Sequence, residues 1–374
     1  MNLGPEIILI MISPTRDSSR ITDYVVSGSE SRVLHLIQYC ENQKIPVQII
    51  TNNYGARILN GRTKFAIKTI QGPRLLEKDQ KFDLLNSFCV LPIATLKSLL
   101  RQKSGVFVTA TGLFPDAFLA SISKILGRRS RTYFHHFVQG NDAKSIVSRA
   151  LQILSLSMLR LANVDLLTFP QNRKQLARLI SPEHLFEFEN GVEKAKSVYT
   201  FGRRSDVDVL YLGRVSTRKG SRDLIEIWKR VVALDPNRKL TVAGSIEDKN
   251  FESEVRDSGL DVKVLGPVSE AEKTSLLDSA SCFISASREE GWGLAVSEAI
   301  AFGLPVVAYN LPAYAYAGES ISRAPIGDYE VFAKLVLQAK KKKNGGVNNL
   351  KSWQEVLRSE LSIILSKEDS VHLS

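Results

Sequence analysis

Short apolar runs alternate along the chain with segments whose apolar residues follow helical spacing. In the first half, such runs predict buried strands at residues 6–12, 47–51, 65–69, 106–110, 132–134 and 166–169. Helical patterns lie between most of them, as in the segment that opens at Gly28 and carries Val33, Leu36 and Ile37. Strands that alternate with helices predict parallel sheets covered by helices on both faces.

The alternation begins again after Asn190 and Gly191, a turn signal followed by a polar stretch to Asp206. Further strands are predicted at 207–212, 239–243, 262–265, 282–285 and 306–309, with helices at 223–234, at 294–302 and from Trp353 onward. We therefore expect an α/β fold of two doubly wound, Rossmann-like domains, residues 1–195 and 196–355. Residues 356–374 are predicted to form a C-terminal helix and tail that pack back toward the first domain.

The composition is that of a soluble globular protein with room for two domains: 374 residues, of which 44% are apolar and 24% charged. Three widely spaced cysteines without a CxxC pair argue against a disulfide framework or a zinc cluster and fit a reducing cytoplasm. The most apolar long stretch, 146–167, is interrupted by Arg149 and Arg160, whereas a spanning helix needs about twenty apolar residues. We expect a cytoplasmic protein with neither a signal peptide nor a spanning helix.

The positive charge lies almost entirely in the first half. Residues 1–194 hold 25 Lys and Arg against 15 Asp and Glu, a net charge of +10, whereas the remainder holds 25 against 24. A one-sided basic surface predicts an anionic partner, such as phosphate groups, acidic lipid or nucleic acid. A generally basic protein without such a partner would show the same excess, so both interpretations stay open.

The most informative segment, residues 288–299, joins a glycine-rich turn to an apolar helix. Gly291 and Gly293 in the turn let the backbone approach a ligand, and the first amide groups of the helix make a site for phosphate. Glu298 lies on the inner stripe of that helix, so its carboxylate needs a partner, for which a ligand hydroxyl would serve, with Glu290 at the mouth of the same site. The alternative makes Glu298 a salt-bridged core residue and Glu290 a surface acid.

A second cluster, residues 212–220, places Arg214, Arg218 and Lys219 directly after a predicted strand. Open α/β sheets bind ligands at the carboxyl ends of their strands, where arginine and lysine neutralise a diphosphate. Alone, the cluster is equally well a basic surface loop. Together with the glycine-rich helix start in the same domain, it predicts a diphosphate site.

These motifs resemble the retaining glycosyltransferases of family 4, which have the GT-B fold, two Rossmann-like domains facing across a cleft. The resemblance rests on Gly213-Arg214 with Lys219-Gly220 and on Glu290-x7-Glu298 within EGWGLAVSEAIAFGLPVVA. Supporting matches are Asn190-Gly191-Val192, Val242-Ala243-Gly244 and Leu265-Gly266-Pro267-Val268. The resemblance therefore covers residues 189–318 and is weak before them.

The resemblance implies that Arg214 and Lys219 hold the donor diphosphate and stabilise the leaving nucleotide, with help from the backbone amides of Gly293 and Leu294. Glu290 would bind hydroxyls of the donor sugar, and Glu298 the ribose. The implied donor site is completed by Gly28, Gly291 and Trp292.

In the first half, the resemblance places Gly28 in the loop after the first strand and a histidine near the sugar. His135 follows the strand at 132–134 and is the expected residue, although His136 is adjacent and packing of one or both histidines at the domain interface is an equal alternative. The implied catalytic set is therefore His135, Arg214, Lys219 and Glu290.

The implied activity is transfer of a hexose, with retention of configuration, from a nucleoside-diphosphate sugar to a hydroxyl acceptor that is a glycan or is lipid-linked. No cofactor and no metal is expected, because Asp206-Val207-Asp208 has DxD spacing but lies at the start of a strand, away from the ligand edge. A nucleotide-sugar epimerase or hydrolase on the same fold and a non-catalytic binding protein remain as alternatives.

The positive first half and the amphipathic stretch from Ser148 to Ala162 predict a peripheral contact with an anionic membrane, at its inner face. Nucleic acid is not expected as a partner, because no basic stripe is interleaved with aromatic residues.

Overall fold

The computed structural model describes residues 7–11, 28–70, 96, 104–138, 143–193, 207–339 and 350–366. The chain forms two compact units. The first unit runs to Asn190 and takes back the chain from Gln354, and the second holds Gly191–Trp353. Asp206 and Cys89 lie outside the described residues, whereas Cys40 and Cys282 are buried free thiols.

Seven parallel strands form the sheet of the first unit, in the order β3-β2-β1-β4-β5-β6-β7. They are β1 (Ile7–Met11), β2 (Val47–Asn52), β3 (Ile67–Ile70), β4 (Val106–Thr109), β5 (Ser130–Phe134), β6 (Asp165–Thr168) and β7 (Leu185–Glu187). The helices are α1 (Gly28–Asn42), α2 (Asn53–Leu59), α5 (Phe114–Ile125), α6 (Ala143–Leu161), α7 (Pro170–Leu176), the 3-10 helix η4 (Pro182–His184) and α13 (Trp353–Leu365). Strands β1, β4, β5 and β6 are buried along their whole length, as helices on both faces of a parallel sheet require.

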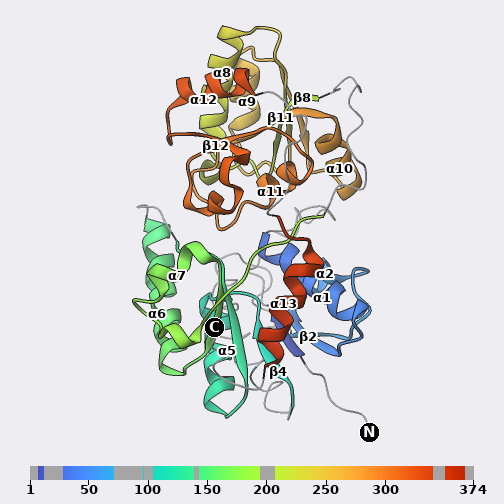
Figure 1. Ribbon diagram of the computed structural model, residues 1–374, viewed down its shortest axis with the longest axis vertical. Helices are drawn as coiled ribbons and strands as arrows, with labels where there is room; N and C mark the ends of the chain where they lie inside the picture. The colour runs from blue at the N-terminus through green and yellow to red at the C-terminus, as the bar shows by residue number, and fades with distance from the viewer. Residues whose placement is uncertain are drawn as a thin grey trace, which may run out of the picture. The chain divides into compact units, whose positions relative to one another are not determined.

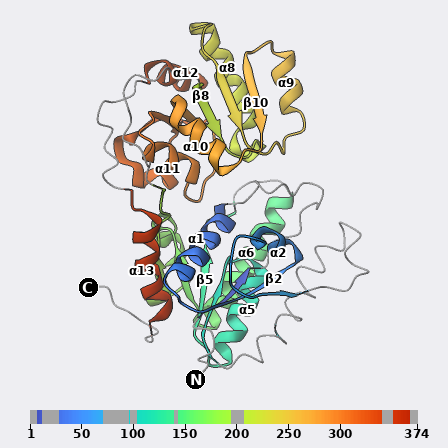
Figure 2. The ribbon, with the colours of Figure 1, turned by 90° about the vertical axis from the view of Figure 1, so that its right-hand side faces the viewer.

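The C-terminal helix α13 is held on the first unit by a buried ion pair, and Figures 1 and 2 both draw it beside α1. Glu360 on α13 pairs with Arg32 on α1, and the Tyr133 hydroxyl on β5 donates to the same carboxylate. Arg32 also donates to the Glu189 carbonyl at 2.7 Å and lies over the Phe188 ring. Burial lowers the pKa of Arg32 to about 10, so the guanidinium stays charged at neutral pH.

Two described segments at the boundary of the units, around Gly191 and around Ser352, run side by side. The Val192 N–H donates to the Lys351 carbonyl at 3.0 Å, and Val192 forms a parallel β-bridge with Ser352. A Cβ atom on Gly191 would stand 2.4 Å from backbone atoms of Trp353, so only glycine fits there.

Six parallel strands form the sheet of the second unit, in the order β10-β9-β8-β11-β12-β13. They are β8 (Val207–Leu212), β9 (Leu240–Ala243), β10 (Val262–Gly266), β11 (Ala280–Ser285), β12 (Val306–Tyr309) and β13 (Ile321–Ala324). The helices are α8 (Ser221–Leu234), α9 (Phe251–Asp257), α10 (Glu270–Ser279), α11 (Leu294–Ala301) and α12 (Tyr329–Gln338), with 3-10 helices η5 (Thr217–Lys219) and η6 (Pro312–Ser320).

The strand order of this second sheet reverses between β8 and β11. From β8 the chain proceeds outward to β9 and β10, and from β11 it proceeds the other way to β12 and β13. Right-handed connections therefore place α8 and α11 on opposite faces. Helix α8 packs against α12, and Figure 1 shows both on one side of the sheet with α10 on the other. The loops after β8 and β11 leave the carboxyl edge side by side and then diverge, and open α/β sheets bind ligands at such a reversal of strand order.

The predicted α/β class with two doubly wound parallel sheets is confirmed. The predicted strands recur with shifts of a residue or two at their ends. The strands β7 and β13 and the helices α9, α10 and α12 were not among the predicted elements. β7 has only three residues and β13 alternates with exposed polar positions, so neither forms an apolar run.

Helix α6 carries an apolar face that is exposed among the described residues of the first unit. Its most exposed large apolar side chains, all on one helical face, are Ile146, Val147, Ile153, Leu154 and Leu161. No helix among the described residues is long and apolar enough to cross a bilayer. These five exposed side chains define the α6 face.

Replacing Glu360 by Leu should strongly destabilise the protein, because it leaves the Arg32 charge buried without its carboxylate. We expect the free energy of unfolding to fall by about 3–5 kcal/mol, measured by urea unfolding followed by circular dichroism. The double variant Arg32→Met/Glu360→Leu should recover most of this loss, since it removes both charges. An equal loss in the double variant would contradict a role for the ion pair.

Candidate functional site

The loops after β8 and β11 bring two predicted site residues together at the point where the strand order reverses. Lys219 lies at the end of η5, after β8, and Glu290 lies in the turn that follows β11. The Lys219 Nζ stands 2.6 Å from Glu290 Oε2, with the side chains 21% and 12% exposed. A cation and a carboxylate thus lie together at the ligand-binding edge, and both remain accessible.

The loop that carries Lys219 is closely packed against its neighbour. Gly220 has a positive φ of 74°, and a Cβ atom there would stand 1.9 Å from the Ala286 carbonyl oxygen. The Arg288 N–H, from the β11 loop, donates to the Arg218 carbonyl at 3.2 Å. Any residue other than glycine at position 220 would push the two loops apart.

The buried side chain of Tyr211 contacts the backbone of the loop that carries Arg214 and Lys219. The Tyr211 hydroxyl, at the end of β8, lies 3.0 Å from the Arg214 carbonyl and 3.4 Å from the Lys219 carbonyl, to which it donates. Burial, reinforced by the charge of Glu290, raises the pKa of Tyr211, so the hydroxyl keeps its proton at neutral pH. One side chain therefore positions the backbone under both predicted phosphate cations.

Arg214 has an acidic neighbour that the sequence did not reveal. Its Nη1 stands 3.3 Å from Oε1 of Glu247, in the loop after β9. That loop extends the sheet beyond its strands, because the Val215 N–H donates to the Ser245 carbonyl and the Glu247 N–H donates to the Val215 carbonyl. The Arg214 side chain is 23% exposed, so it stays open to a ligand at the same edge.

The turn before α11 is shaped by aromatic packing. Gly293 has a φ of 86°, and a Cβ atom there would stand 2.5 Å from the Tyr314 ring. Trp292 is buried and stacks on Tyr316 with ring centroids 4.3 Å apart, and the Tyr316 hydroxyl donates to the Gly293 carbonyl. The Trp292 ring therefore packs inside the unit, and α11 begins at Leu294 directly after the turn.

Glu298 on α11 has its partner on α10. Lys273 Nζ lies 2.8 Å from Glu298 Oε1, and the Glu298 side chain is 25% exposed. Burial raises the pKa of Glu298, although the Lys273 charge acts in the opposite direction. Glu298 is thus half-buried and salt-bridged. Helix α10 was not predicted, although Ser269 and Glu272 at its start carry a capping-box signal that could have revealed it.

His135 and Gly28 belong to the first unit. His135 follows β5, its Nε2 lies 3.0 Å from the Ala110 carbonyl, and its ring lies among Tyr133, Phe169 and Phe188. Burial lowers the pKa of His135 to about 4, so the imidazole is neutral at physiological pH and Nε2 is the donor. Gly28 is exposed at the first residue of α1.

The acidic pair with DxD spacing is described only at Asp208. Its carboxylate accepts from the Lys239 N–H at 3.1 Å and pairs with Arg238 at 3.1 Å. Both partners lie just before β9, at the amino edge of the sheet, so Asp208 ties two strand starts together. No group of three or more metal-ligating side chains occurs in the described part of the chain.

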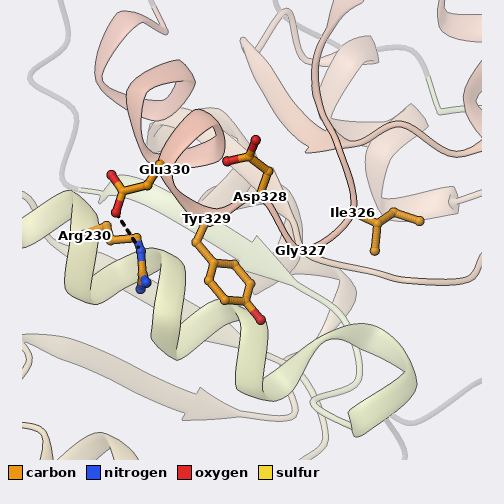
Figure 3. A pocket seen from close by; sticks show the side chains of 6 residues that line it. All are labelled: Arg230, Ile326, Gly327, Asp328, Tyr329 and Glu330. Carbon is orange, nitrogen blue, oxygen red and sulfur yellow. Dashed lines mark hydrogen bonds and ion pairs between the residues drawn. The ribbon is translucent and has the colours of Figure 1, made fainter.

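An open cavity of about 460 Å³ lies beside the start of α12, lined by Arg230 and residues 326–330 (Figure 3). Arg230 pairs with Glu330 at 2.9 Å, and the Tyr329 hydroxyl donates to Asp223 at 3.0 Å. Asp223 also accepts two hydrogen bonds from Arg288. The polar groups around this cavity are thus engaged with one another, and it contains none of the predicted site residues.

Comparison with known proteins finds a family match in the second unit and relatives similar over about a third of the chain. Residues 202–320 match the family described as Glycosyl transferases group 1. The GDP-mannose:cellobiosyl-diphosphopolyprenol alpha-mannosyltransferase of Xanthomonas campestris is 30% identical over 143 residues, 37% of this chain and 38% of that protein. The phosphatidyl-myo-inositol mannosyltransferase of Mycolicibacterium smegmatis is 28% identical over 134 residues, 34% of this chain and 35% of that protein. The matched part thus spans little more than a third of either relative.

Solved structures are similar over nearly the whole chain. Sucrose-phosphate synthase from Thermosynechococcus elongatus has a TM-score of 0.75 at 16% identity, covering 95% of this chain and 98% of that one. HepE of Anabaena, in complex with UDP and glucose, has a TM-score of 0.71 at 14% identity, covering 98% and 100%. At such identities the likeness concerns the fold, and it confirms the GT-B fold that the resemblance implied.

The depressed pKa of His135 predicts a specific loss of stability in acid. Between pH 6.5 and 4 the unfolded chain binds a proton that the folded imidazole does not, so the free energy of unfolding falls as the pH falls through this window. Between pH 7.5 and 4, the free energy of unfolding of wild type, measured by urea titration, should fall by about 3 kcal/mol more than that of His135→Phe. Equal losses in wild type and His135→Phe would show that His135 titrates normally.

Proposed function

We propose that this chain transfers a hexose from a nucleoside-diphosphate sugar to a hydroxyl acceptor. The premise is that it belongs to the glycosyl transferases group 1 family through residues 202–320. The observation that carries the proposal is the Lys219–Glu290 pair at the reversal of strand order, beside Arg214 and the start of α11. Cations and helix amides suit a diphosphate, and carboxylates suit the hydroxyls of a sugar. One edge of the sheet thus offers both kinds of group that a nucleotide sugar needs.

Each group in the second unit has a proposed role. Arg214 and Lys219 bind the diphosphate, together with the backbone of residues 291–294. Glu290 accepts hydrogen bonds from hydroxyls of the donor sugar, and releases Lys219 to the phosphates as the donor arrives. Glu298 accepts from the ribose. Trp292 contributes indirectly, because its ring packs on Tyr316 and holds the turn before α11 in position.

The proposed mechanism is electrostatic. The bond from the anomeric carbon to the diphosphate breaks as negative charge develops on the leaving nucleotide, and Arg214 and Lys219 stabilise that charge. Each contact of this kind is worth about 3 kcal/mol of activation free energy. His135, neutral and placed after β5, and Gly28 at the start of α1 are proposed to contribute from the first unit. Retention of configuration is proposed from the family alone.

The acceptor is proposed to bind residues 1–195, which carry the positive excess, and to be lipid-linked. Two relatives support this through their names, one of which is a diphosphopolyprenol mannosyltransferase and the other a phosphatidylinositol mannosyltransferase. A diphosphate or phosphate in the acceptor fits a net charge of +10 in residues 1–194. The same names favour a mannosyl donor, while the base of the nucleotide is left to experiment.

The exposed α6 face supports peripheral attachment to an anionic membrane. Apolar side chains from Ile146 to Leu161 lie along one side of the helix, which also carries Arg149 and the exposed Arg160. Apolar groups enter the interface of a bilayer while arginines meet acidic headgroups. Attachment at the inner face of the membrane, from the cytoplasm, would present the first unit to a lipid-linked acceptor.

The donor site is tested by thermal stabilisation with GDP, UDP and their hexose conjugates. A ligand at 100 times its Kd should add about 2.7 kcal/mol to the stability of wild type. Lys219→Met should lose most of this stabilisation and lower turnover by roughly 100-fold, because a phosphate contact is gone. Lys239→Met, which changes an exposed lysine at the other edge of the sheet, should behave as wild type.

Either of two results would contradict this proposal and favour another function. If no nucleotide stabilises wild type, a binding protein of another kind becomes the better interpretation. If the donor is consumed at the same rate with and without acceptor, the protein is an epimerase or hydrolase of nucleotide sugars.

The α6 face is tested by flotation with vesicles that contain phosphatidylglycerol. Ile153→Glu/Leu154→Glu should reduce binding at least about tenfold, because two exposed apolar side chains become acidic. Leu234→Glu, an equally exposed change on α8, should leave binding unchanged. Binding that survives in the α6 variant would show that another surface contacts the membrane.

A further inference from the structure

The carboxylate of Glu298 lies on α11, a helix whose other buried residues are apolar except for Ser297. Its neighbours on α11 include Val296, Ala299 and Ile300, all of which are buried. An ionised carboxylate in such surroundings needs a compensating charge or hydrogen bonds. The backbone of α11 offers neither, because its own amide groups are used within the helix after the first turn.

The compensating charge comes from Lys273, on the neighbouring helix. Its Nζ lies 2.8 Å from Glu298 Oε1 and 2.7 Å from Glu270 Oε2, so it bridges two carboxylates. Glu270 is 88% exposed, whereas the Lys273 and Glu298 side chains are 22% and 25% exposed. The bond to Glu298 is therefore the more sheltered of the two and less screened by water.

Lys273 is held in place by a well-defined helix start. Ser269 Oγ accepts from the Glu272 N–H, and Glu272 returns a bond to the Ser269 N–H, which forms a capping box. The Lys273 N–H donates to the Ser269 carbonyl at 2.8 Å, so the residue belongs to the first turn of α10. The capping box and this backbone bond therefore set the position of Lys273 independently of any ligand.

We infer that Lys273 is a positioning residue for the nucleotide site, which orients the Glu298 carboxylate so that it accepts hydrogen bonds from the ribose hydroxyls of a nucleoside diphosphate. The inference rests on the proposed function, in which Glu298 meets the ribose. Lys273 engages Oε1, and no described residue hydrogen-bonds the other oxygen, Oε2. One oxygen is thus held by the protein while the other stays available at a partly exposed position.

The surrounding charges explain why a lysine is needed. Burial raises the pKa of Glu298, Lys273 lowers it, and Glu270 and Glu193 raise it again. Without Lys273 only the groups that raise the pKa would remain, and the carboxyl group would take up a proton at a higher pH. A protonated Glu298 accepts fewer hydrogen bonds, so affinity that depends on it is present above its pKa and is lost as the pH falls through it.

The experiment compares nucleotides with and without ribose hydroxyls in wild type and in Lys273→Met. GDP and UDP, and the 2′,3′-dideoxy form of whichever binds, are titrated by calorimetry between pH 6 and 9. Wild type should bind the ribonucleotide roughly 30-fold more tightly than the dideoxy form, the size of a strong hydrogen bond to a charged group. In Lys273→Met this ratio should fall to roughly threefold at pH 7 and recover toward pH 9, while the dideoxy affinity stays within about twofold of wild type.

Two further variants separate positioning from simple loss of packing. Lys273→Arg keeps the charge and should retain most of the ratio, whereas Glu270→Gln, which removes only the exposed partner, should leave it unchanged. If Lys273→Met does not fold, Lys273→Gln serves in its place, with the same expected ratio.

Each outcome decides between the alternatives. Equal weakening of both nucleotides in Lys273→Met, with an unchanged pH profile, would make the ion pair a structural bond and overturn the inference while the proposed function stands. A ratio of one in wild type would likewise overturn it, because Glu298 would not meet the ribose. If neither GDP nor UDP binds wild type, the proposed function fails and the inference fails with it.

Discussion

The loops that follow neighbouring parallel strands diverge to opposite faces of a sheet only where the strand order reverses, and in the second unit this happens between β8 and β11. The Lys219–Glu290 ion pair forms across that point. Strand order alone cannot hold the two loops at ion-pair distance. Gly220 allows them to touch, and Tyr211 supports the backbone beneath. The chemistry of the edge therefore depends on backbone geometry that two residues without reactive groups maintain.

Each cation of the candidate site is paired with a carboxylate in the absence of a ligand. Lys219, Arg214 and Lys273 each face a carboxylate, from Glu290, Glu247 and Glu298 respectively. Isolated charges at a half-buried edge would be costly, and pairing them lowers that cost. In the proposed function, a diphosphate would replace a carboxylate partner and so exchange one anion for another, and the cations would not have to stay unpaired before it binds.

The first unit is organised by a different interaction, the buried pair of Arg32 and Glu360. Because Arg32 also holds the Glu189 carbonyl, one guanidinium fixes both the segment that leaves this unit and the helix that returns to it. A buried pair of this kind adds little net stability but penalises every arrangement in which a charge is left alone. It therefore specifies where α13 packs.

The sequence by itself determined the α/β class, the two sheets, most strands and the glycine and charge motifs, because these follow from local periodicity and from the stop chemistry of short segments. The same local motifs allowed the candidates for the donor site to be chosen, namely Arg214, Lys219, Glu290 and Glu298. Only the tertiary structure decided which charges meet. The partners of Arg214 and Glu298 lie 33 and 25 residues away in loops and helices without an apolar signal, and no periodicity connects them. The burial that lowers the pKa of His135 likewise comes from rings distant in sequence, which only folding brings around it.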